Sequence, residues 1–281
     1  MSAYLELTKP NIVWLILLST GIGFYVASEG PLAFGLLFHT LCATALLAGG
    51  TGTLNQWLER DIDAKMRRTQ GRPLPSGRIG ERSALWFGLG LSFAGLAYLL
   101  VAVNLLSFAV GLATLISYVW VYTPMKTRSP LSTFVGAFPG AAPLLLGWVA
   151  VRNGMGLEAW VLFAILFLWQ FPHFYAIGRM YREDYAQAGI CMLPVIERNG
   201  DSTGRQIISY ALNLLMVSLA PWVLGMAGPV YAVAAVVLGA GYLYYGVLAA
   251  RRKTVAQARK LLRASVIYLP LLYVFLVADK I

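Results

Sequence analysis

Charged residues are scarce in this 281-residue chain. Asp, Glu, Lys and Arg together make up 12% of it, about half of the roughly 25% that is usual in soluble domains. Cysteine is scarcer still, because Cys42 and Cys191 are the only two, and they offer neither a disulfide framework nor metal-finger spacing. Hydrophobic residues account for 59% of the chain and the mean hydropathy is +0.69. This composition excludes a disulfide-rich secreted scaffold, a disordered chain and a zinc ribbon, and it indicates an integral membrane protein.

Long apolar runs predict nine membrane-spanning helices, since a bilayer core of about 30 Å needs about 20 apolar residues per helix. We expect the spans near 11–28, 33–57, 84–103, 105–123, 131–151, 158–180, 206–224, 229–249 and 262–279. The runs are continuously apolar rather than alternating, which argues against a β-barrel. We therefore expect an all-α polytopic membrane bundle, one membrane-embedded domain over residues 1–281, with a central cavity that opens to the cytoplasmic side.

The basic residues are distributed unevenly between the two sides of this bundle. The formal net charge is +10, from 22 Lys and Arg against 12 Asp and Glu. In the nine-span topology, 20 of these 22 residues share the side of the N-terminus, and only Arg152 and Lys280 lie on the other. Cytoplasmic loops carry the excess of Lys and Arg, so we expect a cytoplasmic N-terminus and an external C-terminus. The charge therefore indicates membrane topology, and we expect no nucleic-acid partner.

The ends and connections of the chain suggest where it works. The first apolar run follows Glu6 and lacks a small-residue cleavage pattern, and no Arg- and Ser-rich transit segment precedes it. We therefore expect no cleaved signal peptide and a location in the bacterial cytoplasmic membrane. The long connections, near 58–83, 181–205 and 250–261, all lie on the cytoplasmic side, so we expect the chemistry to face the cytoplasm.

Eight of the twelve acidic residues occur in two of these connections. They are Glu59, Asp61, Asp63 and Glu81 in the first, and Glu183, Asp184, Glu197 and Asp201 in the second. Asn55, Glu59 and Asp63 are spaced by four residues, which places them on one face of a helix, whereas Asp61 points away from it. Mg²⁺ prefers such oxygen ligands and binds one or two carboxylates plus substrate phosphates. The spacing therefore indicates a metal site at the boundary between membrane and cytosol.

The same residues have a simpler interpretation, in which the carboxylates pair with basic side chains of their own loop. These neighbours are Arg60, Lys65, Arg67 and Arg68. The surrounding basic residues are equally open to two interpretations: they set topology and bind anionic lipid, or they hold a diphosphate, whose oxygens match the planar guanidinium group. The candidates are Arg67, Arg68, Arg72, Lys126, Arg128 and Arg182. We expect a mixed assignment, and a topological role alone for the acid-free run 251–263.

Histidine is limited to two positions, both inside expected spans. For His39 we favour a hydrogen bond between helices. His173 follows Pro172 in an aromatic-rich turn, where the proline is expected to kink the span, and a polar group in this setting is either functional or packed. The Gly-, Ala- and Pro-rich stretch 136–143 permits close helix approach or irregular backbone around a cavity.

The first acidic segment carries a resemblance to a known superfamily. Asn55-x3-Glu59-x3-Asp63, followed by Arg-Thr-x-x-Arg-Pro-Leu over 68–74, resembles the first acidic motif of the UbiA-type intramembrane prenyltransferases. Within that superfamily the chain is similar to the haem O synthase (protohaem IX farnesyltransferase) branch. The stretches that carry this similarity are Tyr4–Pro10, Tyr122–Arg128, Gly140–Pro143, Trp169–Phe174, Asp184–Tyr185 and Leu193–Val195. The resemblance covers residues 4 to about 200.

The chain also departs from the superfamily pattern at two places. Glu59 stands where the superfamily usually has aspartate, and the second acidic motif has Glu183 and Asp184 instead of two aspartates four residues apart. The resemblance therefore leaves open whether there are one or two Mg²⁺ sites.

The resemblance implies a substrate, a cofactor and a set of site residues. Farnesyl diphosphate would place its tail between helices and its diphosphate at the cytoplasmic mouth, and the farnesyl group would add to a vinyl group of haem b, with water completing haem O. The implied catalytic and Mg²⁺-binding residues are Asn55, Glu59, Asp63 and Asp184. The implied substrate-binding residues are Arg67, Arg68, Arg72, Lys126, Arg128, His173, Tyr181 and Arg182. His173 would orient the porphyrin or bind its iron, and a downstream haem A synthase is an implied partner.

Two other functions remain open at this point. A related prenyltransferase would modify a quinone precursor or another aromatic acceptor. A secondary transporter is the weaker alternative, because no acidic residue lies at the centre of an expected span, where transporters of this size place their ion sites.

Overall fold

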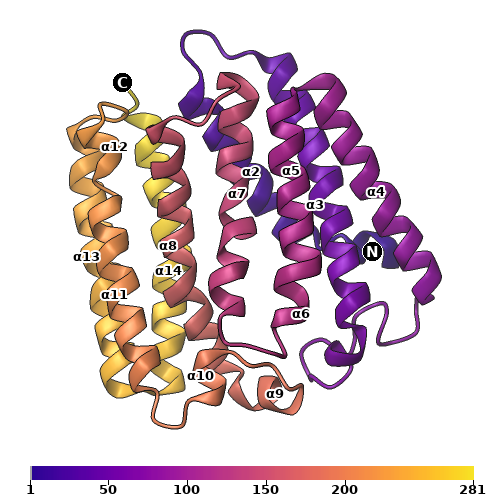
Figure 1. Ribbon diagram of the computed structural model, residues 1–281. Helices are drawn as coiled ribbons and strands as arrows, with labels where there is room; N and C mark the ends of the chain where they lie inside the picture. Colours follow the sequence, from indigo (N-terminus) through magenta and orange to yellow (C-terminus); the bar gives the residue numbers. More distant parts are fainter. Residues whose placement is uncertain (1) are drawn as a thin grey trace.

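The computed structural model describes residues 2–281 (Figure 1). Its elements are α1 (Ala3–Leu7), α2 (Pro10–Ala27), α3 (Phe34–Asp63), α4 (Glu81–Ala102), α5 (Leu105–Ile116), η1 (Ser117–Tyr122), α6 (Thr123–Met125), α7 (Ser132–Arg152), α8 (Leu157–Met180), α9 (Arg182–Gln187), α10 (Leu193–Ile196), α11 (Asp201–Val217), α12 (Ala220–Val223), α13 (Pro229–Arg252) and α14 (Val255–Ala278). Apart from one isolated bridge between Ala227 and Lys280, the regular structure in this range is helical.

The expected nine spans are confirmed for the described part of the chain, where nine helices are long and apolar enough to cross a membrane. The fourth span combines α5, η1 and α6, and the seventh combines α11 and α12. Figure 1 shows the long helices side by side, with α9 and α10 at one end of the bundle and the C-terminus at the other. We call these the α9 end and the C-terminal end.

Several helices extend into segments that were expected to be loops. α3 continues past residue 57 to Asp63, because Glu and Arg are good helix formers and a helix need not end where the membrane does. The expected loop 250–261 is reduced to two residues between α13 and α14: Lys253 ends α13 in a left-handed conformation, and the Thr254 side chain accepts a hydrogen bond from the first turn of α14.

The expected loop 181–205 likewise contains α9, α10 and the start of α11. Glu197 caps α11: its carboxylate accepts hydrogen bonds from the backbone N–H groups of Ser202 (2.6 Å) and Thr203 (2.9 Å). Burial alone would raise the pKa of Glu197, but the hydrogen bonds from Thr203 and Ser202 lower it to about 2. Asp201 forms an ion pair with Lys253. Two acids of the second cluster therefore stabilise the fold locally.

The central helix α7 shows which property of its small residues matters. The expectation of an irregular backbone over 136–143 is wrong, because α7 is helical throughout, with Pro139 and Pro143 inside it. Close approach is confirmed: a Cβ on Gly136 would lie 2.5 Å from the Tyr122 ring, and one on Gly147 would lie 1.9 Å from the carbonyl oxygen of Thr20. Glycine is needed at both positions because neighbouring helices approach the backbone of α7 itself.

The two histidines each join a pair of helices. His39 Nδ1 lies 2.9 Å from the Tyr98 hydroxyl, which links α3 to α4 and confirms the expected bond between helices. His173 Nδ1 lies 2.7 Å from Ser265 Oγ and so links α8 to α14. α8 remains helical on both sides of Pro172, so the kink expected there does not interrupt the helix.

Candidate active site

Three polar side chains are buried near the C-terminal end of α3. Their residues Asn55, Glu59 and Asp63 are 1%, 7% and 1% exposed to solvent. Because α3 is continuous through Asp63, their four-residue spacing puts them on one face of the helix. Asp61 lies off this face, with a side chain that is 82% exposed, as the spacing predicts. We call Asn55, Glu59 and Asp63 the acidic face.

Two of these side chains contact cations from the ends of other spans. Lys9 Nζ, immediately before α2, donates a hydrogen bond of 2.6 Å to Asn55 Oδ1. Asn55 Nδ2 in turn donates to Thr123 Oγ1 at 3.0 Å, and Lys126 Nζ lies 2.5 Å from Glu59 Oε1. The acidic face is thus the place where the ends of the first, second and fourth spans meet.

The third side chain is covered by the connection between α3 and α4. Arg72 Nη1 lies 2.6 Å from Asp63 Oδ2, and the Thr69 hydroxyl donates to the backbone carbonyl of Asp63 at 2.8 Å. The Arg72 side chain keeps 27% of its exposure whereas Asp63 keeps 1%. A charge buried this deeply requires a partner, and here the partner is partly open to solvent.

The cations of the acidic face are themselves perturbed. Lys9 adopts φ 55°, in the left-handed region, which costs a non-glycine residue roughly 1–2 kcal/mol. Burial, with nearby Arg72 acting in the same direction, lowers the pKa of the Lys9 ammonium to about 7. Burial would also lower the pKa of Lys126, but Glu59 and Tyr122 raise it above its ordinary value. When all of these groups are charged, the three cations Lys9, Arg72 and Lys126 face the two carboxylates of Glu59 and Asp63. The excess of positive charge attracts an anion.

The acidic face also has the chemistry that a hard divalent cation requires. Its amide and two carboxylates provide oxygen ligands, which Mg²⁺ prefers. Glu59 Oε1 is buried and its one charged partner is Lys126 Nζ, so a metal ion would compete with this ammonium group for the carboxylate. Within residues 2–281, no three His, Cys, Asp or Glu side chains form a group that could hold a metal ion. A metal here would therefore depend on Asn55 and on oxygens of the substrate as further ligands.

The second acidic segment lies next to the first. Met66, just after α3, packs in one small apolar cluster with Tyr185, Ala188 and Val195. The guanidinium of Arg68 lies over the Tyr185 ring at 5.7 Å, and its Nη2 donates to the Tyr185 hydroxyl at 3.1 Å.

Other predicted residues line a hollow of about 540 Å³ beside this contact. Arg67, Tyr181, Arg182 and Asp184 are among its lining residues, and we call it the arginine-lined hollow. Tyr181 also lies under the Arg68 guanidinium at 5.1 Å.

Some predicted residues have their described contacts elsewhere. Arg128 is exposed, and Arg182 Nη2 donates to the backbone carbonyl of Glu197 at 3.0 Å. His173 contacts Ser265 of α14 and stacks on Trp169 with ring centroids 4.6 Å apart. These contacts favour the packing interpretation of His173.

Sequence reasoning missed two members of the site. Lys9 and Thr123 both contact Asn55, from 46 and 68 residues away in the chain. Lys9 counted toward the topology signal and lies in the resembling stretch Tyr4–Pro10, but it was given no role in the site, although it is the one basic residue before the first span. Thr123 carries no charge that would single it out.

Comparison with known proteins agrees with this architecture. The model of the UbiA prenyltransferase family matches residues 16–269, which is most of the chain. The chain belongs to the UbiA prenyltransferase family. The matched range of this UbiA-family chain includes the whole acidic face. It also includes both segments that meet at the arginine-lined hollow.

Individual relatives cover nearly all of the chain. A protoheme IX farnesyltransferase of Solibacter usitatus is 52% identical over 289 residues, with 100% of this chain and 99% of the relative covered. One of Koribacter versatilis is 45% identical, with 99% and 93% covered.

Solved structures share the fold at low sequence identity. A digeranylgeranylglyceryl phosphate synthase has a TM-score of 0.84 at 18% identity, covering 99% of this chain and 97% of its own. A UbiA homolog from Archaeoglobus fulgidus bound to GPP and Mg²⁺ has a TM-score of 0.71 at 17% identity, covering 98% and 99%. The fold of the UbiA family is therefore confirmed for this multi-pass membrane protein.

Proposed function

We propose that this chain transfers the farnesyl group of farnesyl diphosphate to a vinyl group of haem b. The observation that carries the proposal is the acidic face, where buried oxygen ligands meet cations from three segments. The relatives named protoheme IX farnesyltransferase, at 52% and 45% identity over almost the whole chain, support the choice of donor and acceptor.

The acidic face has the groups that departure of a diphosphate requires. We propose that Asn55, Glu59 and Asp63 hold Mg²⁺ together with oxygens of the substrate, and that the ion stabilises negative charge on the leaving oxygens when bound; the predicted ligand Asp184 lines the neighbouring hollow instead. The A. fulgidus homolog bound to GPP and Mg²⁺ supports this assignment. Arg72 Nη1 and Lys126 Nζ, which now contact carboxylates, would donate to the diphosphate oxygens.

The reaction breaks the bond between C1 of the farnesyl group and the diphosphate oxygen, and the electron pair leaves with the diphosphate. The allylic cation forms a carbon–carbon bond with the vinyl group, and water then adds to the resulting cation and releases a proton, which gives the hydroxyethylfarnesyl product, haem O. Water must stay away from the first cation. Tyr122, whose ring lies 4.6 Å from Lys126 Nζ, and Tyr181 present faces that can stabilise it.

The remaining predicted residues have outer roles in this proposal. Arg67, Arg68, Arg128 and Arg182 guide anionic substrates to the site, and His173 holds α8 to α14. The site faces the cytoplasm of a bacterial cell membrane, with the C-terminus outside, and the whole chain acts as one membrane-embedded domain. The product would pass to a downstream haem A synthase.

Product mass tests the proposed reaction. Purified protein is incubated with farnesyl diphosphate, Mg²⁺ and either haem b or 4-hydroxybenzoate, and we expect haem b alone to gain the farnesyl group and one water. Transfer to 4-hydroxybenzoate alone would instead identify a prenyltransferase of quinone precursors. Substrate-dependent current in proteoliposomes, without a prenylated product, would identify a transporter.

A further inference from the structure

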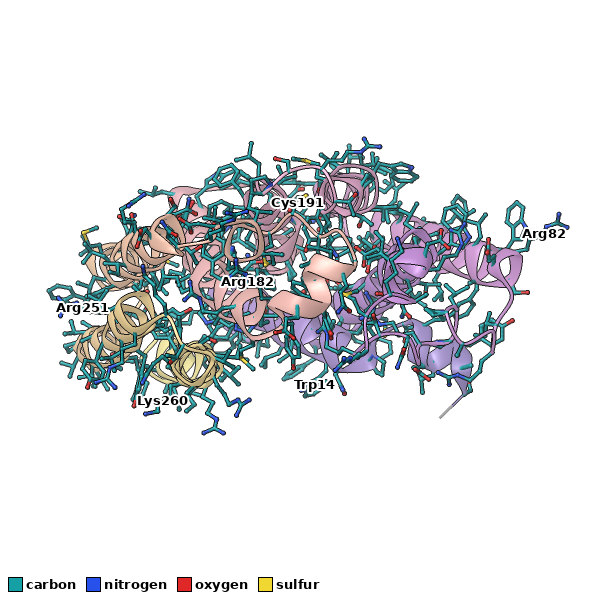
Figure 2. All side chains as sticks on the ribbon, turned by 90° about the horizontal axis from the view of Figure 1, so that it is seen from below. Trp14, Arg82, Arg182, Cys191, Arg251 and Lys260 are labelled. Carbon is teal, nitrogen blue, oxygen red and sulfur yellow. The ribbon has the colours of Figure 1, made fainter. Side chains whose placement is uncertain are left out.

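The arginine-lined hollow has a strong excess of positive charge. Its ionisable lining residues are Arg67, Arg179, Arg182, Glu183, Asp184, Arg198 and Lys253. Five cations and two carboxylates leave a formal charge of +3. Figure 2 shows the α9 end of the bundle, with Arg182 near its middle and Arg82 and Arg251 at opposite edges.

Two of the five cations serve the fold. Lys253 forms an ion pair with Asp201 at the start of α11, and Arg182 donates to the backbone carbonyl of Glu197 at 3.0 Å. Both contacts hold together segments that line the hollow. We therefore assign neither side chain to ligand binding in the hollow.

Three guanidinium groups remain available. Within residues 2–281, the side chains of Arg67, Arg179 and Arg198 form no hydrogen bond or ion pair, whereas most other arginines near them do. Arg179 is half-buried at the end of α8. Gly200 has φ +67°, and a Cβ added to it would lie only 2.2 Å from Arg179 Nη2. The guanidinium group of Arg179 therefore occupies space that is open because residue 200 is glycine. Planar guanidinium groups held without a carboxylate partner match carboxylates of a ligand, which they bind with two parallel hydrogen bonds.

A single short segment joins this hollow to the acidic face. Arg67 lines the hollow, the next residue, Arg68, contacts Tyr185, and Arg72 pairs with Asp63. This segment connects the hollow to the side chains that we propose to hold the diphosphate.

We propose that Arg67, Arg179 and Arg198 bind the two propionate carboxylates of haem b. This inference rests on the proposed function and names the part of the site that recognises the acceptor. Two carboxylates would offset two of the three excess positive charges of the hollow, and its volume of about 540 Å³ is within the usual range of small-ligand pockets. The propionates lie on one side of the macrocycle and a vinyl group on the other, so anchoring the propionates directs a vinyl group away from the hollow, toward the acidic face.

The test compares haem b with its dimethyl ester, in which both carboxylates are neutral. The dissociation constant of each is measured by absorbance titration of the purified protein in phosphatidylcholine nanodiscs. We expect the ester to bind wild-type protein at least tenfold more weakly. Arg67→Gln and Arg198→Gln should each weaken binding of haem b about tenfold, which corresponds to about 1.4 kcal/mol, and leave binding of the ester unchanged. Arg198→Lys should recover part of the loss.

Arg82→Gln is the matched control, because it removes the same charge from an exposed position at the edge of the same end (Figure 2). We expect it to leave both dissociation constants unchanged. The KM for farnesyl diphosphate should stay the same in Arg198→Gln, since the diphosphate binds at the acidic face. An unchanged melting temperature shows that the exposed Arg67 and Arg198 can be replaced without unfolding the protein.

Three results would overturn the inference. Equal affinity of wild-type protein for haem b and its ester would show that the carboxylates are not recognised. Equal weakening of both ligands in the glutamine variants would show that the arginines act by shape rather than charge. An effect of the variants that appears only with phosphatidylglycerol in the nanodiscs would assign the hollow to an anionic lipid headgroup. The proposed function fails separately, by the absence of farnesylated haem b in the mass assay.

Discussion

The two ends of the bundle use their buried cations differently. At the α9 end, Lys9, Lys126 and Arg72 contact side-chain oxygens of the acidic face. At the C-terminal end, Arg152 Nε donates to the backbone carbonyl of Ala27 at 2.6 Å, and Lys280 Nζ donates to carbonyls of the same segment, one of them at 2.7 Å. The one carboxylate partner at this end is the exposed Glu29, which pairs with Arg152 Nη2 at 2.6 Å. The C-terminal end also has the larger hollow, about 860 Å³, which Arg152 and Lys280 help to line.

The partner atoms decide what these cations can do. The last backbone carbonyls of a helix have no hydrogen-bond partner within it and carry the negative end of its dipole. Arg152 and Lys280 supply hydrogen-bond donors to the carbonyls at the end of α2 and just after it. At the acidic face, the oxygens of a bound diphosphate would replace the carboxylates as partners of Arg72 and Lys126, and the carboxylates would then be free to bind a metal ion. Of these two hollows, the smaller lies beside the proposed active site and the larger lies at the other end.

Asp63→Asn should produce the largest effect of any single change at the acidic face. It keeps the size of the side chain and removes the charge that pairs with Arg72 and that we propose to bind Mg²⁺. We expect turnover to fall about 10³-fold, which corresponds to roughly 4 kcal/mol in activation free energy, with the protein still folded. Asp61→Asn, at an exposed position two residues away, should retain full turnover. Near-normal turnover in Asp63→Asn would remove Asp63 from the ligand set.

Lys126→Met should affect both stability and turnover. It leaves Glu59 buried without its cation, which costs about 3–5 kcal/mol in the free energy of unfolding, and turnover should fall about 10²-fold, the size of effect expected on loss of one stabilising donor. The double variant Glu59→Gln/Lys126→Met should recover most of the melting temperature but none of the turnover. Recovery of both would mean that this pair only stabilises the fold.

Arg152→Met should show the opposite pattern at the C-terminal end. The Ala27 carbonyl loses its donor and the exposed Glu29 loses its ion pair, which contributes little at the surface, so we expect a loss of about 1–3 kcal/mol in the free energy of unfolding. Turnover per folded molecule should stay at the wild-type value, because no predicted site residue lies at this end. A fall in turnover beyond the fall in folded fraction would contradict the division between the two ends.

These comparisons also show how far the sequence alone could lead. The nine spans follow from the bilayer thickness, and Asn55, Glu59 and Asp63 follow from helical periodicity, so both were predictable. The contacts of Lys9 and Thr123 with Asn55 depend on how α2, α3 and the fourth span pack, which no local pattern encodes.

Topology and composition likewise left the roles of individual charged residues undetermined. Arg152 and Lys280 were visible as exceptions to the charge asymmetry, but apart from the Glu29 carboxylate that pairs with Arg152, their acceptors are backbone carbonyls, which are present at every residue and give no sequence signal. The count of acidic residues overestimated how many members of the second cluster are available for a site, because Glu197 caps α11 and Asp201 pairs with Lys253. A carboxylate's role depends on which donors the fold brings to it.

Glu197→Gln should produce the smallest effect, and one that depends on pH. The hydrogen bonds at the start of α11 lower the pKa of Glu197 from 4.5 to about 2, so the ionised carboxylate stabilises the folded state fully above about pH 4.5. That stabilisation is lost as the pH falls through about 2. Thermal unfolding in detergent should therefore show Glu197→Gln less stable by about 1 kcal/mol at neutral pH, with the gap narrowing below pH 4.5 and turnover unaffected. A gap that widens on acidification would contradict this role, because a cap at the α9 end that depends on its negative charge must weaken as Glu197 is protonated.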